Sequence, residues 1–176
     1  LLFLLLTLTS QFTYPQDPSN DTVATATELT DLNYVETNIR LDLADVNTGT
    51  PVGCNTNGFS GVYYKFTATE NNYVNAFIQS NSTITNSFVI AYTANNLNAT
   101  SMSELTHLPE SACAFGIQTS FTITSGQSYY IMVHRSDANA LTDFTFSEVP
   151  DVPQSERDAL IAFYNATGGD SWTNNT

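Results

Sequence analysis

The sequence predicts an all-β fold, an antiparallel β-sandwich or jelly roll of about seven or eight strands, with a short C-terminal helix. Apolar and polar residues alternate with period two through much of residues 22–149, as expected for strands with one buried face. Clusters of Asn, Gly and Ser separate the alternating segments, for example at 47–49 and 125–127. Helical spacing begins only after residue 153.

Each expected strand is marked by two or three apolar residues at alternate positions. Together the alternating segments cover residues 39–43, 62–66, 74–78, 88–92, 121–123, 129–133 and 144–146. The stretch from Asn98 to Ala112 is the least regular, and we expect a long loop there that crosses one end of the sandwich.

The N-terminal residues are apolar and do not begin with methionine. Residues 1–10 (LLFLLLTLTS) are too few to span a bilayer, which takes ~20 residues. They fit the apolar core of a truncated secretory signal peptide, with a buried N-terminal strand as the alternative. We therefore expect a secreted or cell-surface protein with no membrane span, in which residues 11–21 form a flexible lead-in to the sandwich at 22–149.

The C-terminal part changes character after a proline-containing linker at 150–154. Ser155 is a good helix N-cap, and Leu160, Ile161 and Phe163 follow with helical spacing before Gly168. A lone helix of about ten residues is unstable in water. We expect residues 155–176 to open a further, truncated domain and to dock intramolecularly on its missing remainder.

The charge balance excludes one class of partner. Seventeen acids stand against four bases, giving a formal net charge of -13. A nucleic-acid-binding protein needs a basic surface to replace counterions on phosphates, so nucleic acid is excluded as a partner. Only 12% of the residues are charged, and the polar, uncharged remainder is typical of extracellular β proteins.

The two cysteines, Cys54 and Cys113, are predicted to form a disulfide because an exported protein folds in an oxidising compartment. The alternative is two separate buried thiols.

Several segments carry a resemblance to a known family. They are the Cys54 region, residues 61–68 (GVYYKFTA), 87–92 (SFVIAY), 123–133 (ITSGQSYYIMV) and 143–146 (DFTF). Residues 20–149 thereby resemble the bacterial pre-peptidase C-terminal (PPC) domain. The resemblance implies a β-sandwich that serves as an accessory module of secreted proteins. Gly61 and Tyr63 stand where that family usually has an acid and a tryptophan.

The tail resembles another family. Residues 156–172 (ERDALIAFYNATGGDSW) are similar to the N-terminal opening segment of bacterial leucine-rich-repeat proteins. This implies a downstream solenoid, whose terminus needs a capping helix with one apolar face.

Candidate sites are few. His107 and His134 have no metal-binding spacing, and no G-x-S-x-G motif occurs, so we predict no catalytic residues and no enzyme activity within 1–176. Asp42, Asp45 and Asn47 are weak calcium candidates, and no other cofactor is expected.

The aromatic residues Tyr63, Tyr73, Phe77 and Tyr130 could form a ligand-binding platform. The competing interpretation places them in a second core layer or at an interdomain contact.

The sequence thus favours a non-catalytic accessory or binding module of an extracellular leucine-rich-repeat adhesion or interaction protein. Its partner would be an extracellular protein or polysaccharide. Two alternatives stay open: an accessory domain of a secreted peptidase or other hydrolase, and a carbohydrate-binding module that uses the tyrosines.

Overall fold

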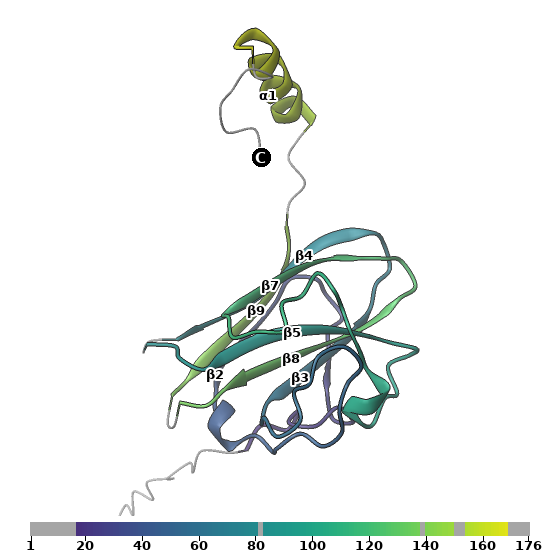
Figure 1. The fold of residues 1–176 in the computed structure, drawn as a ribbon, viewed down its shortest axis with the longest axis vertical. Coiled ribbons are helices and arrows are strands. Elements are labelled where there is room, and N and C mark those ends of the chain that lie inside the picture. Colours follow the sequence, from purple (N-terminus) through teal and green to yellow (C-terminus); the bar gives the residue numbers. More distant parts are fainter. Residues whose placement is uncertain (1–16, 81–82, 138–139, 150–153, 169–176) are drawn as a thin grey trace, which may run out of the picture.

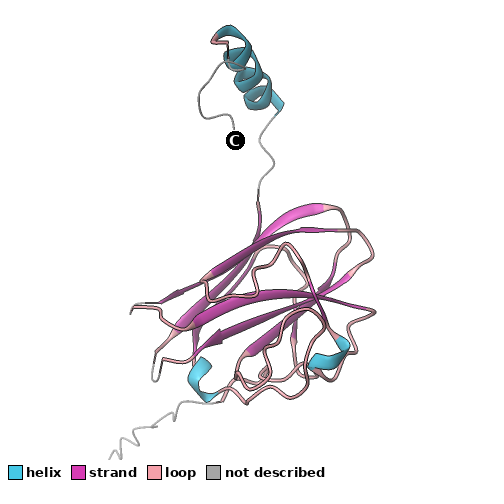
Figure 2. Cartoon of the chain, viewed as in Figure 1, coloured by secondary structure: helices cyan, strands magenta, loops and turns pink. Residues whose placement is uncertain are grey.

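A computed structural model describes residues 17–80, 83–137, 140–149 and 154–168. Its strands form two facing sheets (Figures 1 and 2). A five-stranded sheet has the order β1-β3-β8-β5-β6, and a four-stranded sheet has the order β2-β9-β4-β7. All pairs are antiparallel except β1 with β3. The predicted all-β sandwich with a short C-terminal helix is confirmed, with nine strands in the described residues.

The elements have the following bounds. The five-stranded sheet contains β1 (Thr27–Glu28), β3 (Val62–Thr67), β8 (Ser128–Arg135), β5 (Ser87–Ala94) and β6 (Thr106–His107). The four-stranded sheet contains β2 (Tyr34–Ile39), β9 (Thr142–Glu148), β4 (Asn72–Ser80) and β7 (Gln118–Ile123). The helical elements are η1 (Leu41–Leu43), η2 (Met102–Glu104) and α1 (Gln154–Ala166).

The main core lies between the sheets and is built by the alternating residues. In β4, Val74, Ala76 and Ile78 point inward and are fully buried. Aromatic rings from opposite sheets stack in the same layer, with the ring centroids of Tyr64 and Phe144 4.0 Å apart. Period-two burial therefore fixes which face of each strand meets the other sheet.

A second core covers the outer face of the five-stranded sheet. Strand β8 is buried along its whole length, and so is β5 except at Thr93. The outward-facing residues pack under loop residues such as Val23, Cys54 and Met102. Because both faces of β5 and β8 are covered, their sequences are nearly continuous apolar runs instead of alternating ones.

Two local expectations were wrong. Residues 39–43 were expected to form one strand, but β2 ends at Ile39 and the 3-10 helix η1 follows. Asn38 has a positive φ of 60° just before this break, and Arg40 pairs with Asp42 at 2.7 Å inside the turn.

The expected loop at 98–112 contains regular structure. The 3-10 helix η2 is closed by a capping box, in which Ser101 Oγ accepts from Ser103 N and Glu104 Oε1 accepts from Ser101 N. Strand β6 then pairs with β5.

Helix α1 lies where the helical spacing predicts a helix, but it begins at Gln154, so Ser155, the expected N-cap, lies inside its first turn. Its apolar residues Leu160, Ile161 and Phe163 are 63%, 53% and 59% exposed. Within the described ranges, no helix is both long and apolar enough to cross a bilayer. The signal-peptide prediction for 1–10, most of the lead-in, most of the linker and residues 169–176 lie outside the described residues.

Candidate functional site

The structure confirms the predicted disulfide. Cys54 and Cys113 are joined, with their Cα atoms 5.7 Å apart. The bond ties the loop after η1 to the segment before β7, above the outer face of β5. It therefore closes the second core layer at one end.

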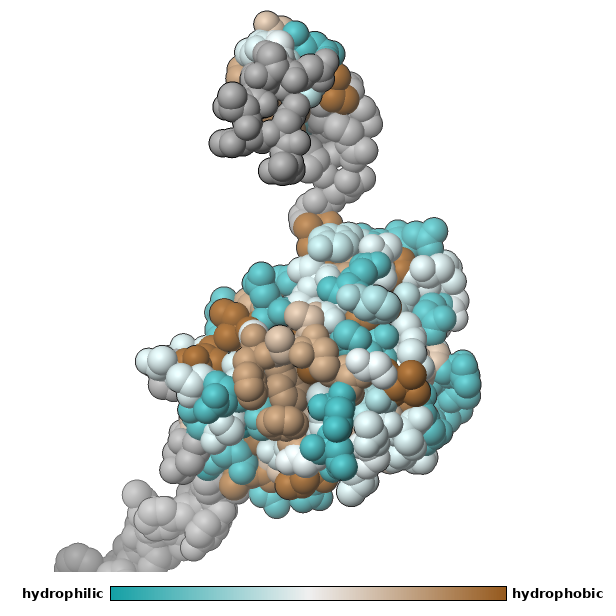
Figure 3. Space-filling model, viewed as in Figure 1, coloured by the Kyte–Doolittle hydropathy of each residue, from teal (hydrophilic) through white to brown (hydrophobic). Residues whose placement is uncertain are grey.

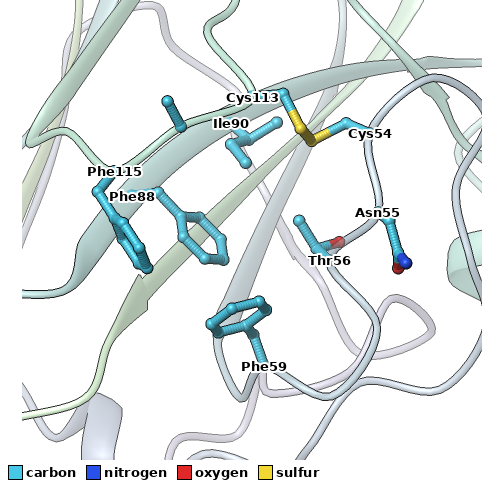
Figure 4. Close-up of a pocket in the computed structure, with 9 residues that line it drawn as sticks. Cys54, Asn55, Thr56, Phe59, Phe88, Ile90, Cys113 and Phe115 are labelled. Atoms are coloured by element: carbon cyan, nitrogen blue, oxygen red, sulfur yellow. A yellow bond between two sulfur atoms is a disulfide. The ribbon is translucent and has the colours of Figure 1, made fainter.

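A cavity of about 310 Å³ lies beside this disulfide (Figure 4). Strand β5 supplies Phe88 and Ile90, and the disulfide loops supply Phe59 and Phe115. The three phenylalanine rings converge on one side in Figure 4, with the disulfide on the other. Figure 3 shows apolar atoms gathered on this face of the sandwich, over β5.

Part of the cavity rim is formed by residues 113–115, which begin a segment, 113–117, whose backbone is held at several points. Besides the disulfide, Gly116 N–H donates to the Ser87 carbonyl at 2.8 Å, and Ile78 N–H donates to the Ile117 carbonyl at 2.8 Å. This segment nevertheless displays apolar side chains, because Phe115 is 62% exposed and Ile117 is 48% exposed. Exposed apolar side chains on a fixed backbone are typical of a recognition surface.

The cavity lining carries no ionisable side chain. Two of its polar groups are hydrogen-bonded within the protein: the Thr56 hydroxyl lies 3.2 Å from the Tyr92 hydroxyl, and Asn55 Oδ1 accepts from Asn57 N–H at 3.0 Å. This arrangement offers apolar contact and ring stacking, and few free hydrogen-bonding groups.

His134 lies next to the cavity, and its side chain has a structural role in packing. Its ring stacks on Phe88 with centroids 4.7 Å apart, and its Nδ1 contacts the Ser60 carbonyl. Burial lowers the pKa of His134, so the neutral ring is favoured and donates its Nδ1 proton to that carbonyl.

The other histidine, His107, is half-buried opposite Tyr92 on the β5–β6 pair. Its Nε2 is buried with no hydrogen-bond partner in the described part of the chain. In those same residues, no group of three or more His, Cys, Asp or Glu side chains lies close enough to hold a metal ion.

The three calcium candidates lie in different environments. Asp42 is paired with Arg40, Asp45 is exposed, and Asn47 is buried with its side chain bonded to the Tyr63 hydroxyl and to Met132 Sδ at 3.2 Å. At Gly61, where the resembled family has an acid, a Cβ would lie 2.7 Å from the Val133 carbonyl oxygen. The close approach of β3 and β8 therefore leaves no space for a side chain there.

The candidate tyrosines divide between the two interpretations. Tyr63 and Tyr130 are fully buried in the second core layer and present no ring face to a ligand. Tyr73 is 46% exposed on the outer face of the four-stranded sheet, with Phe77 half-buried on the same face. Of the named tyrosines, only Tyr73 stays available to a ligand.

Buried tyrosines make stability sensitive to alkaline pH. Burial, and secondarily Glu36, raises the pKa of Tyr64 well above its ordinary value, and burial raises the pKa of Tyr92 to about 12. Tyr63 shifts in the same direction, first through burial. Since these pKa values are raised in the folded state, their stabilising effect is complete below the unfolded pKa of about 10 and is lost above it.

We therefore expect cooperative unfolding as the pH rises from about 10 to 12, with tyrosinate absorbance at 295 nm appearing together with loss of the β-sheet circular-dichroism signal. In Tyr64→Phe, which keeps the ring on Phe144 but removes one ionisable hydroxyl, the fall in stability across this pH range should be shallower. Complete tyrosine ionisation in a still-folded chain would contradict the prediction.

Comparisons with known proteins do not identify the chain: no protein-family model matches it, and no curated protein does so.

The aromatic cavity was missed by sequence reasoning, because Phe59, Phe88 and Phe115 are far apart in the chain. The one available signal was the position of Phe115 two residues after Cys113.

Proposed function

We propose that this chain is a non-catalytic binding module of a secreted or cell-surface bacterial protein. Its parent would be an extracellular leucine-rich-repeat adhesion or interaction protein. The observation that carries this proposal is the apolar recognition surface formed by the 113–117 segment and the cavity beneath it. The disulfide supports an extracellular location, because such bonds persist in oxidising compartments.

A recognition surface accounts for features that stability does not require. Phe115 and Ile117 gain little from burial, yet their backbone is fixed at three points. Pre-ordered contacts reduce the entropy lost on binding. The net charge of -13 would in turn disfavour anionic partners, leaving neutral polymers and neutral or basic protein surfaces.

Helix α1 supports a role in a larger assembly. Leu160, Ile161 and Phe163 are exposed, and a single helix gains most of its stability from packing an apolar face. Together with the leucine-rich-repeat resemblance of residues 156–172, this favours α1 as a helix that docks on a following domain.

The test of this role is retention of the purified chain on immobilised extracellular polysaccharides and matrix proteins, combined with peptidase and glycosidase assays. We expect retention on at least one matrix and no turnover. Phe115→Ser should weaken retention. Turnover of any substrate by the chain would contradict the non-catalytic assignment, and binding to none of the matrices would contradict the binding role.

Tyr73 favours a second candidate function, carbohydrate binding on the outer face of the four-stranded sheet. Tyr73 and Phe77 lie four residues apart on β4, about 13 Å, among the uncharged neighbours Thr122, Gln118 and Thr145. Sugar rings stack on such aromatic faces.

If this face binds polysaccharide, Tyr73→Ala should weaken retention on the polymer about tenfold, whereas Val52→Ala should leave it unchanged. Val52 is a suitable control because it is 62% exposed and pairs with Thr106 at the five-stranded sheet, away from this face. Equal retention of both variants and the unaltered chain in affinity electrophoresis would remove Tyr73 from the site.

A further inference from the structure

We propose that the cavity between the disulfide and β5 binds an uncharged, largely apolar small molecule of about two fused rings. This inference rests on the proposed binding role and names the ligand class for the cavity. Three properties of the cavity carry it: its size, its lining and its fixed walls.

The volume sets the size of the ligand. An apolar cavity of about 150 Å³ holds a single benzene ring, and small-molecule sites begin at about 300 Å³. The cavity here measures about 310 Å³. It is therefore large enough for an indole or naphthalene ring system.

The lining selects against charge. Placing a charged group in a site without ionisable side chains would remove it from water with no compensating partner. An uncharged ring has no charge to remove from water. It can also pack against the phenylalanine rings of the cavity, which already contact one another edge to face. Phe59 and Phe88 have centroids 5.3 Å apart at 83°, and Phe59 and Phe115 have centroids 6.3 Å apart at 80°.

The lining also selects against a sugar. A pyranose carries several hydroxyl groups, each of which needs a hydrogen-bond partner when it leaves water. The Thr56 hydroxyl is bonded to Tyr92, and Asn55 Oδ1 is bonded to the Asn57 backbone. Asn55 and Thr56 supply the polar side chains of the lining, too few for the several hydroxyl groups of a sugar, so flat apolar molecules are favoured.

The walls are fixed before the ligand arrives. Phe88 and Ile90 belong to the central strand β5, which is paired along its whole length with β8. Phe115 is held by the neighbouring disulfide and by the Gly116–Ser87 hydrogen bond. A preformed site of this kind binds without the entropy loss of ordering its walls.

The test uses N-phenyl-1-naphthylamine, an uncharged dye whose fluorescence rises in apolar sites. The whole chain is titrated with the dye, and bound dye is then challenged with indole and with methyl β-glucoside. Phe115→Ser removes one wall, and Val35→Ser is the matched control, because Val35 is as exposed as Phe115, at 61% against 62%, and lies on the four-stranded sheet outside the cavity lining.

We expect saturable dye binding at one site per chain, displacement by indole and no displacement by the glucoside. Phe115→Ser should weaken dye binding at least tenfold, and Val35→Ser less than twofold. Thermal melts should show both variants folded, since both side chains are exposed in the parent chain.

Three outcomes would overturn the inference: no saturable binding, displacement by the glucoside in place of indole, or equal weakening by the two variants, which would indicate nonspecific adsorption. Retention on a polymer without dye binding overturns the cavity inference alone and leaves the broader binding role standing. Dye binding without retention on any matrix leaves the cavity inference standing and contradicts the broader binding role.

Discussion

Replacing both Cys54 and Cys113 with serine is expected to lower the free energy of unfolding by about 4 kcal/mol. The disulfide joins residues 59 positions apart, so its loss releases a long loop in the unfolded chain. The native state also loses the bond that holds the 113–117 segment over β5. Urea unfolding followed by circular dichroism measures the change.

A reducing agent provides the control for this prediction. It should destabilise the unaltered chain by a similar amount and leave the double serine variant unchanged. Because the sandwich core between the sheets does not involve the disulfide, the variant should keep its β-sheet spectrum at low urea. Equal stability of the variant and the parent would show that the bond does not constrain the unfolded chain.

The second large effect is expected at Arg135, whose guanidinium is almost fully buried, with the residue 1% exposed, at the end of β8. Its nitrogens donate to Asp137 Oδ2 at 2.8 Å, to Thr142 Oγ1 at 3.2 Å and to the Thr83 carbonyl at 3.0 Å. Arg135→Met keeps much of the stem but leaves these acceptors without their donor. We expect a loss of about 3 kcal/mol in unfolding free energy.

Measuring the unfolding free energy of the parent chain and of Arg135→Met as a function of pH separates the electrostatic part of the loss. Hydrogen bonds from Thr85, and then from Arg135, lower the pKa of Asp137 to about 2. Because this pKa is depressed in the folded state, the resulting stability is present above the unfolded pKa of about 4 and is lost as the pH falls toward 2. Arg135→Met should make this acid-induced loss smaller.

Arg40→Met is the matched control, since Arg40 also pairs with an aspartate but is more accessible to water, with its side chain 16% exposed against 1% for Arg135. Its effect on unfolding should be clearly smaller, because water can replace the lost contacts. An equal loss in the two variants would show that burial of Arg135 is not what makes its contacts strong.

The strands that could be predicted are those whose burial follows the alternating pattern. Val74, Ala76 and Ile78 identify β4 because its outer face stays exposed to water. Residues 39–43 alternate in the same way and are nevertheless divided between a strand end and a 3-10 helix. At that point the backbone conformation follows the positive φ at Asn38 and the Arg40–Asp42 ion pair. Neither feature can be recognised from the alternation of apolar and polar residues.

The cysteine pairing was predictable because two cysteines allow only one intramolecular bond. The roles of the tyrosines were not, since Tyr63, Tyr73 and Tyr130 all occupy strand positions that could face either water or a second layer. Only the packing of the loops on the five-stranded sheet buries two of them and leaves Tyr73 exposed.

The sequence by itself therefore predicted the all-β class and the C-terminal helix, because side-chain alternation and helical spacing act over short distances. It also predicted the disulfide, because the two cysteines of a protein expected to be exported allow one intramolecular bond. The aromatic cavity was decided by the tertiary structure alone. Phe59, Phe88 and Phe115 meet only after strand pairing and the disulfide bring three distant segments onto one face of β5.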